Sequence, residues 1–143
     1  MKINCLVDTS VWSEALRRKN VSIKSENTFL YQLIQNEENI FLAGVILQEL
    51  LSGIKNEKTF IEIKDILLNF DLIESETEDY IFAASIQNKI SSKGISASTV
   101  DLLLVSIAIR RDYYLLSYDK DFKYISKHTN LKLLNFESYM KMK

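Results

Sequence analysis

One stretch near the N-terminus decides how the rest of the chain is interpreted: Ile3-Asn4-Cys5-Leu6-Val7-Asp8-Thr9-Ser10. Its first five residues form a short apolar run without a charged side chain, which is typical of a strand buried on both faces. Asp8 ends the run, and the hydroxyls of Thr9 and Ser10 can cap a helix that begins near Val11. An aspartate that ends a strand is often only a turn residue. Because ligands of open parallel sheets bind at the carboxyl ends of the strands, we also treat Asp8 as a candidate site residue.

The composition is that of an ordinary globular protein, with 47% hydrophobic and 26% charged residues. A length of 143 residues suits one domain, residues 1–143, that buries its own core. The chain has no apolar run long enough to cross a membrane and no basic region followed by a signal core. The single cysteine, Cys5, excludes an internal disulfide framework. We therefore expect a cytoplasmic protein in a reducing setting.

The charge balance sets a limit on nucleic-acid binding. Lys and Arg number 18 and Asp and Glu 19, so the net charge of −1 gives no global positive field. A local basic patch together with metal ions can still hold a phosphate backbone. The cations Arg17, Arg18 and Lys19 suit the end of the first helix. His128, the only histidine, lies outside every motif described below and is interpreted as a surface or helix-end residue.

Strand and helix patterns alternate along the chain. We expect strands at residues 3–7, 39–42, 70–73, 113–117 and 131–134. We expect helices at residues 11–18, from a cap at Ser25 through 34, at 43–54, 60–67, 76–92, 98–109 and 119–127, and in a last turn or two after 135. Gly94 is expected to close the fifth helix in a left-handed conformation. The alternation predicts an α/β domain of three layers, with a mostly parallel central sheet and helices on both faces.

Two further acids lie at the starts or edges of predicted helices. Glu49 is next to the apolar stripe of its helix, where a surface glutamate is less comfortable than on the opposite face. Asp101 has capping-box spacing from Ser98, and an acid in a first helical turn is favoured by the helix dipole. The helix behind Asp101 is apolar nearly all round, so we expect its N-terminus to point at the edge of the sheet.

A last pair of acids follows the fourth predicted strand. Asp119 occupies the same place after its strand as Asp8 does after the first, and Asp121 is two residues further on. Each acid has a structural explanation as a cap or a first-turn residue. Together they form a set that converges on one crevice, and metal binding explains such a set. Mg²⁺ and Mn²⁺ prefer carboxylate oxygens, and metal ions at a phosphodiester can activate water and stabilise the reacting oxygens.

Four short motifs span nearly the whole chain: Val7–Trp12, Gln48–Gly53, Gly94-Ile95 followed by Asp101–Ala108, and Leu115–Phe122. They resemble the motifs of the PIN-domain nucleases, and most closely those of the VapC-type toxins of bacterial toxin–antitoxin pairs. They also occur in that family's order. The resemblance implies a PIN-like fold.

The resemblance also implies roles for individual residues. The metal-binding and catalytic acids it points to are Asp8, Glu49, Asp101 and Asp119, with Asp121 as a candidate fifth ligand, and Thr9 and Ser117 as supporting residues. Ser117 stands where the family usually has threonine, so a hydroxyl that can orient a carboxylate is retained.

The function implied is that of a metal-dependent endoribonuclease toxin. Mg²⁺ or Mn²⁺ is the expected cofactor, RNA the substrate, and a cognate antitoxin and a second copy of the chain the protein partners, with no membrane involved. One alternative is a catalytically inactive PIN-like module that binds RNA or protein, which the loss of acids would mark. Another is an aspartate-phosphorylating α/β domain. A phosphatase of that kind needs a second aspartate two positions after the first, where this chain has Ser10.

Overall fold

The structure is a computed structural model that describes residues 1–16 and 28–143. The predicted cap at Ser25 and the basic residues Arg17, Arg18 and Lys19 lie outside the described residues. Within them, Thr28 begins the second helix, because its side chain accepts a hydrogen bond from the amide of Tyr31 at 3.2 Å.

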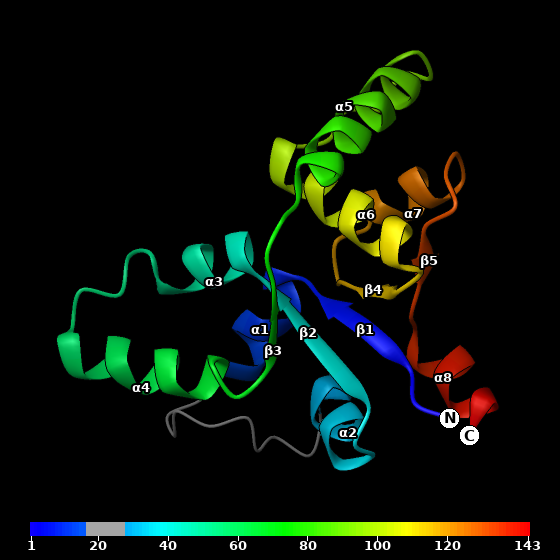
Figure 1. Cartoon of the computed structure of the whole chain (residues 1–143). Helices are drawn as coiled ribbons and strands as arrows, with labels where there is room; N and C mark the ends of the chain where they lie inside the picture. Colours follow the sequence, from blue (N-terminus) through cyan, green and yellow to red (C-terminus); the bar gives the residue numbers. More distant parts are fainter. Residues whose placement is uncertain (17–27) are drawn as a thin grey trace.

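A parallel sheet of five strands forms the centre of the molecule (Figure 1). The strands are β1 (Asn4–Val7), β2 (Asn39–Ala43), β3 (Asp71–Ile73), β4 (Tyr114–Leu116) and β5 (Lys132–Leu133). Their order across the sheet is β3-β2-β1-β4-β5, and each of the four pairings is parallel. Strand β1 is central, with Cys5 opposite Ile40 on one side and Tyr114 on the other. The predicted α/β fold with a parallel sheet is confirmed.

The strand order creates one special position between β1 and β4. From β1 the chain moves outward through β2 to β3, and from β4 it moves outward in the other direction to β5. Adjacent strands whose connections leave in opposite directions form a topological switch point, and a crevice opens there at their carboxyl ends. Asp8 directly follows β1, and Asp119 follows β4 after two intervening residues. The topology therefore brings these two acids to the same edge.

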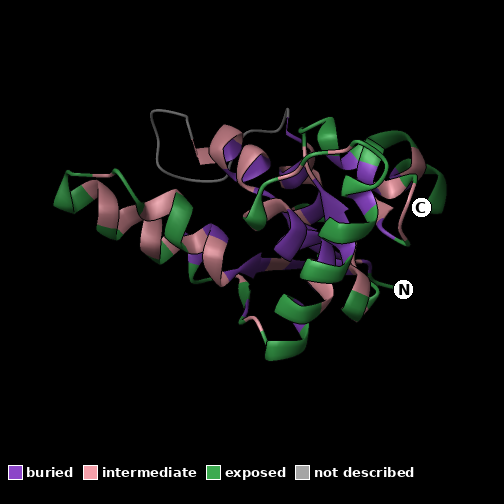
Figure 2. Ribbon diagram, turned by 90° about the horizontal axis from the view of Figure 1, so that it is seen from above, coloured by how far each residue is buried: buried purple, intermediate pink, exposed green. Residues whose placement is uncertain are grey.

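Helices lie on both faces of the sheet, as expected (Figures 1 and 2). They are α1 (Thr9–Leu16), α2 (Phe29–Gln35), α3 (Gly44–Leu51), α4 (Glu57–Leu67), α5 (Thr77–Ser91), α6 (Thr99–Arg111), α7 (Asp121–Ser126) and α8 (Phe136–Met142). Helix α6 is the most deeply buried of them, since every residue from Leu102 to Ala108 is buried. Strand β1 is also buried on both faces at Cys5, Leu6 and Val7. Among the described residues, no helix is both long enough and apolar enough to span a membrane.

The start of α1 and the end of α3 differ from prediction. Helix α1 begins at Thr9, directly after Asp8, so Thr9 and Ser10 are inside the helix and do not precede it. Helix α3 ends at Leu51, because Ser52 is extended and Gly53 has a φ of +89°. A Cβ on Gly53 would meet no atom within 4 Å, so backbone conformation and not close approach explains this glycine. Gly94, with a φ of +77°, has the predicted left-handed conformation after α5.

The starts of α4 and α7 also differ from prediction. Helix α4 begins at Glu57, three residues before the prediction, because the side chain of Asn56 accepts a hydrogen bond from the amide of Thr59. Helix α7 begins at Asp121, two residues later than predicted. Asp119 is therefore in the loop between β4 and α7, outside the helix.

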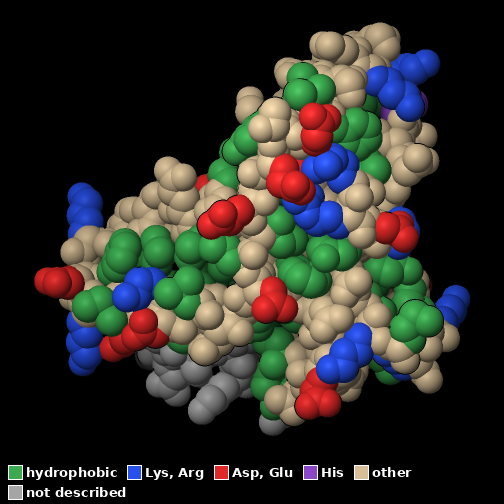
Figure 3. Space-filling model, in the orientation of Figure 1, with side chains coloured by type: hydrophobic (Ala, Val, Ile, Leu, Met, Phe, Trp, Pro, Cys, Tyr) green, Lys and Arg blue, Asp and Glu red, His purple; other side chains and the backbone are tan. Residues whose placement is uncertain are grey.

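Helices α3 and α4 extend from one side of the sheet, and α5 projects from the other (Figure 1). Of the α4 residues only Leu67 is buried, and Figure 2 shows most of this helix as intermediate or exposed. Hydrophobic side chains gather over α3 and α4 on the face shown in Figure 3. Exposed apolar residues on and beside α4 include Ile61 and Leu68, which keep 45% and 54% of their surface in solvent.

Candidate functional site

Asp8 is held at the switch point by the backbone of two strands. Its amide donates to the carbonyl of Leu116 at 2.9 Å, which ties the end of β1 to the end of β4. Its own carbonyl accepts hydrogen bonds from the amides of Val11 and Trp12 in the first turn of α1. The residue is only 7% exposed. Asp8 therefore presents its carboxylate from a rigid position between the central strands and a helix start.

Two serine hydroxyls orient the Asp8 carboxylate. Ser117 Oγ donates to Asp8 Oδ2 at 2.6 Å, and Ser10 Oγ donates to the same oxygen at 3.2 Å. The two hydroxyl oxygens are 3.3 Å apart. No described residue donates to Asp8 Oδ1, so this oxygen has both lone pairs available. Ser117 was expected to orient a carboxylate. Ser10 is predicted from the sequence as a capping residue, and its place two positions after Asp8 is the signal that indicates this further contact.

The same hydroxyls position the loop that follows β4. The amide of Tyr118 donates to Ser10 Oγ and the amide of Asp119 to Ser117 Oγ, each at 3.0 Å. Asp119 Oδ1 in turn accepts the amide of Asp121 at 2.9 Å, which is the capping contact considered as its structural explanation. Both Asp119 and Asp121 are exposed. The capping contact uses one carboxylate oxygen of Asp119 and leaves the other unpaired among the described residues.

Asp101 approaches the switch point from the N-terminus of α6. Its amide donates to Ser98 Oγ at 3.1 Å, which is one half of the capping box considered from the sequence. Burial raises the pKa of Asp101 above its usual value, the hydrogen bond to Ser98 opposes this, and the charges of Asp8, Asp119 and Asp121 raise the pKa further. The charges of these three acids therefore act on Asp101 in the folded protein.

Glu49 reaches the same surroundings from α3. The residue is exposed overall, but loss of hydration at its carboxyl raises its pKa, and the charges of Asp8 and Asp101 add to the rise. Thr9, the other expected supporting residue, behaves differently. Its Oγ1 is buried and has no hydrogen-bond partner among the described residues, so it does not orient Asp8.

The arrangement fits a divalent cation in its chemistry. It offers carboxylate oxygens and excess negative charge at the carboxyl ends of β1 and β4, which hard cations such as Mg²⁺ prefer. Within residues 1–16 and 28–143, no group of three or more acid, histidine or cysteine side chains is drawn together closely enough to enclose an ion. Mg²⁺ usually keeps several waters and needs only one or two direct carboxylates, so a loose set of acids still suits it. Asp8, with its free Oδ1 and its serine contacts, is the best oriented of the set.

Comparison with known proteins agrees with this architecture. The family model described as "PIN domain" matches residues 5–128. No curated protein sequence matches the chain.

Solved structures give similar folds at low sequence identity. The structure of VapBC2 from Rickettsia felis bound to a promoter DNA fragment has a TM-score of 0.73 and 19% identity, covering 94% of this chain and 99% of that chain. DNA-bound VapBC from Salmonella typhimurium has a TM-score of 0.76 and 13% identity, covering 92% of this chain and 97% of that chain. VapBC-1 from nontypeable Haemophilus influenzae has a TM-score of 0.72 and 14% identity, covering 93% of this chain and 98% of that chain. The match to the family model over most of the chain shows that this chain belongs to the PIN domain family.

Proposed function

We propose that the chain, as a single nuclease domain of residues 1–143, is a metal-dependent endoribonuclease. The proposed ligands of one or two Mg²⁺ or Mn²⁺ ions are Asp8, Glu49, Asp101 and Asp119, with Asp121 as a candidate fifth. The observation that carries the proposal is the position of Asp8 at the switch point, where Ser117 and Ser10 orient its carboxylate. In support, the charges of Asp8 and Asp101 raise the pKa of Glu49, and those of Asp8, Asp119 and Asp121 raise the pKa of Asp101. Acids that repel one another in the folded protein are stabilised together when a cation binds among them.

A bound divalent cation supplies Lewis acidity at a phosphodiester and makes water a stronger nucleophile at neutral pH. The chain's own residues supply position. Ser117 and Ser10 fix the orientation of Asp8, and Ser117 also holds the loop that carries Asp119. A hydroxyl that supports a ligating carboxylate in this way contributes to affinity and activity without touching the substrate.

We further propose that the nuclease acts as a toxin in the cytoplasm, where a cognate antitoxin neutralises it. Support comes from the solved structures of similar fold. Several are described as VapBC complexes, and one from Mycobacterium tuberculosis is described as a member of the VapBC family of toxin–antitoxin systems. An antitoxin that covers the acid crevice would block RNA from reaching Asp8.

A homodimer is the last part of the proposal. Ile61, Leu68 and Leu72 are exposed apolar side chains on α4, at its end and on β3. Burying such a surface against a second copy removes apolar area from water and so favours association. Sedimentation of the purified chain across a concentration series tests this part by itself.

The nuclease proposal is tested with purified protein and cellular RNA. We expect discrete RNA fragments with Mg²⁺ or Mn²⁺ and none with excess chelator. Asp8→Asn preserves size and most of the local packing but removes the charge, so it should abolish cleavage while melting near the wild-type temperature. Equal cleavage by the wild type with metal and with chelator would refute the metal mechanism. Full activity of the folded Asp8→Asn variant would refute the role of Asp8.

A further inference from the structure

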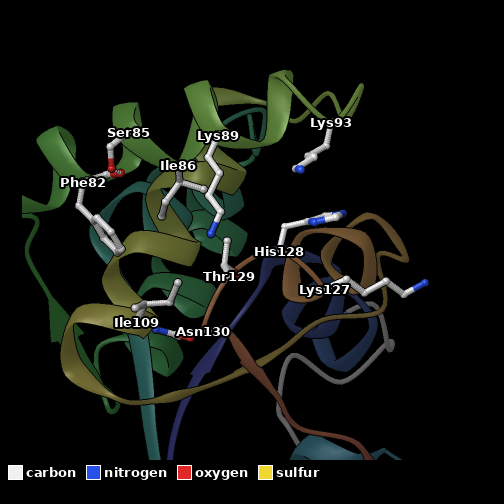
Figure 4. Close-up of a pocket in the computed structure, with 10 residues that line it drawn as sticks. All are labelled: Phe82, Ser85, Ile86, Lys89, Lys93, Ile109, Lys127, His128, Thr129 and Asn130. Atoms are coloured by element: carbon white, nitrogen blue, oxygen red, sulfur yellow. Dashed lines mark hydrogen bonds between the residues drawn. The ribbon is translucent and has the colours of Figure 1, made fainter.

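A second hollow lies away from the acid crevice, between α5 and the segment that joins α7 to β5 (Figure 4). It has a volume of about 570 Å³. Its basic lining residues are Lys89, Lys93, Lys127 and His128, and none of the described lining residues is acidic. We call this hollow the basic groove. In a chain whose net charge is −1, such a group of cations without acids is a local concentration of positive charge.

The cations of the basic groove are not neutralised by neighbours. Within the described part of the chain, none of Lys89, Lys93 and Lys127 is in an ion pair. Figure 4 shows Lys89 pointing from α5 toward Thr129 across the groove, while Lys127 points outward. Lys89 lies in the last turn of α5, where the helix dipole favours a cation. That local preference explains a lysine at a helix end, but it does not explain the hollow into which the side chain extends.

The floor of the basic groove is apolar and partly aromatic. Phe82 and Ile109 line the end opposite Lys93 (Figure 4). The α5 segment from Phe82 to Ser91 is about 14 Å long at 1.5 Å per residue. Cations that track a phosphate backbone, together with an aromatic ring on which a base can stack, are the combination that binds single-stranded nucleic acid. An acidic peptide would use the cations but would have no base to place on Phe82.

The basic groove and Asp101 are joined in sequence by residues 92–98, which run from the end of α5 to Ser98, the cap of α6.

We propose that the basic groove binds the phosphodiester backbone of single-stranded RNA, away from the acid crevice. This inference rests on the proposed nuclease function and adds a second surface that contacts its substrate. Lys89 and Lys93 are the residues that contact phosphates, and Phe82 offers its ring to a base.

The test measures RNA binding without cleavage. A short fluorescent oligouridylate is titrated with protein in excess chelator, and its anisotropy is followed at several salt concentrations. The variant Lys89→Gln/Lys93→Gln is compared with Lys55→Gln/Lys58→Gln, which makes the same charge change at exposed positions around the start of α4. Thermal melts show that each variant is folded.

Loss of the groove lysines should weaken binding roughly tenfold and reduce the slope of log affinity against log salt by about 1.4, since each phosphate contact on a single strand contributes about 0.7. The α4 variant should bind nearly as the wild type does. Equal weakening by both double variants, or an unchanged salt slope in the groove variant, would overturn the inference. Poly-glutamate should compete far more weakly than unlabelled RNA. Equal competition would assign the groove to an acidic protein segment and would also overturn it.

The nuclease proposal and the groove inference fail separately. If the wild type cleaves RNA with metal but binding does not depend on the groove lysines, only the groove inference is wrong. If binding depends on those lysines but no cleavage occurs with any divalent metal, the nuclease proposal is wrong and the groove inference stands as an RNA-binding surface.

Discussion

The substitution Asp79→Asn tests what holds α5 onto α6, the helix that carries Asp101. Asp79 is completely buried. Its Oδ1 accepts hydrogen bonds from Arg110 at 2.7 Å and from Arg111 at 2.9 Å. Its Oδ2 accepts from Arg111 at 3.0 Å and from the amide of Glu76 at 2.8 Å. One buried carboxylate therefore joins the first turn of α5 to the last turn of α6.

The magnitude follows from the pKa of Asp79. Burial raises this pKa, but hydrogen bonds from Arg111, the Glu76 amide and Arg110 together lower it more, from 3.8 to about 2. A carboxyl whose pKa is depressed in the folded state stabilises the fold above its unfolded pKa. That contribution is lost as pH falls from 3.8 through 2. At 1.36 kcal/mol for each pKa unit, the ionised form contributes about 2 kcal/mol at pH 7.

We expect Asp79→Asn to lower the free energy of unfolding by about 2–3 kcal/mol at pH 7, because the substitution removes the ionised carboxylate. The loss is no larger because the partly exposed arginines can regain water. The assay is urea unfolding followed by the fluorescence of Trp12, the single buried tryptophan. The difference from wild type should shrink by about 2 kcal/mol between pH 5 and pH 2, as the wild-type carboxylate is protonated.

The matched control is Asp65→Asn. Asp65 is 3.6 Å from Lys64 and its side chain is 67% exposed, so this surface pair should contribute less than about 1 kcal/mol. Two results would refute the reasoning about Asp79. One is a loss at pH 7 no larger than that of the control, and the other is a difference from wild type that stays constant from pH 7 to pH 2.

Three predictions concern the acid crevice. Ser117→Ala should reduce metal-dependent cleavage about 10- to 100-fold, and Ser117→Thr should restore it; equal activity of all three proteins would exclude the positioning role. Mg²⁺ or Mn²⁺ should raise the melting temperature of the wild type, whereas Asp101→Asn should lose much of that rise; an unchanged rise would exclude Asp101 as a ligand. Without metal, Asp101→Asn should unfold no more easily than wild type at pH 7. A carboxyl with a raised pKa destabilises the fold near neutrality, and the penalty falls as pH drops through that pKa; a loss of about 0.5–2 kcal/mol in urea melts would instead indicate a cap.

The sequence by itself determined the local elements, and it is also the source of the candidate acids. The uncharged run before Asp8 predicted a strand buried on both faces, and Cys5, Leu6 and Val7 are buried. Alternating patterns predicted the parallel sheet and the helices on both faces, and Gly94 has the left-handed conformation expected of it. The buried strand and the left-handed glycine depend on residues that are close in the chain, so a periodic pattern or a single glycine is enough to encode them. The parallel sheet follows from the alternation of strands and helices along the chain.

Only the tertiary structure decided which residues face one another. Ser117 meets Asp8 across 109 positions of the chain, and Arg110 meets Asp79 across 31. Neither pair leaves a pattern in the sequence, because each depends on the strand order that puts β4 beside β1 and on the packing of α5 against α6. The basic groove depends on the same packing, since its cations come from α5 and from the segment after α7. A helical or alternating pattern specifies which face of an element is buried, but the partner of that face is chosen by the whole fold.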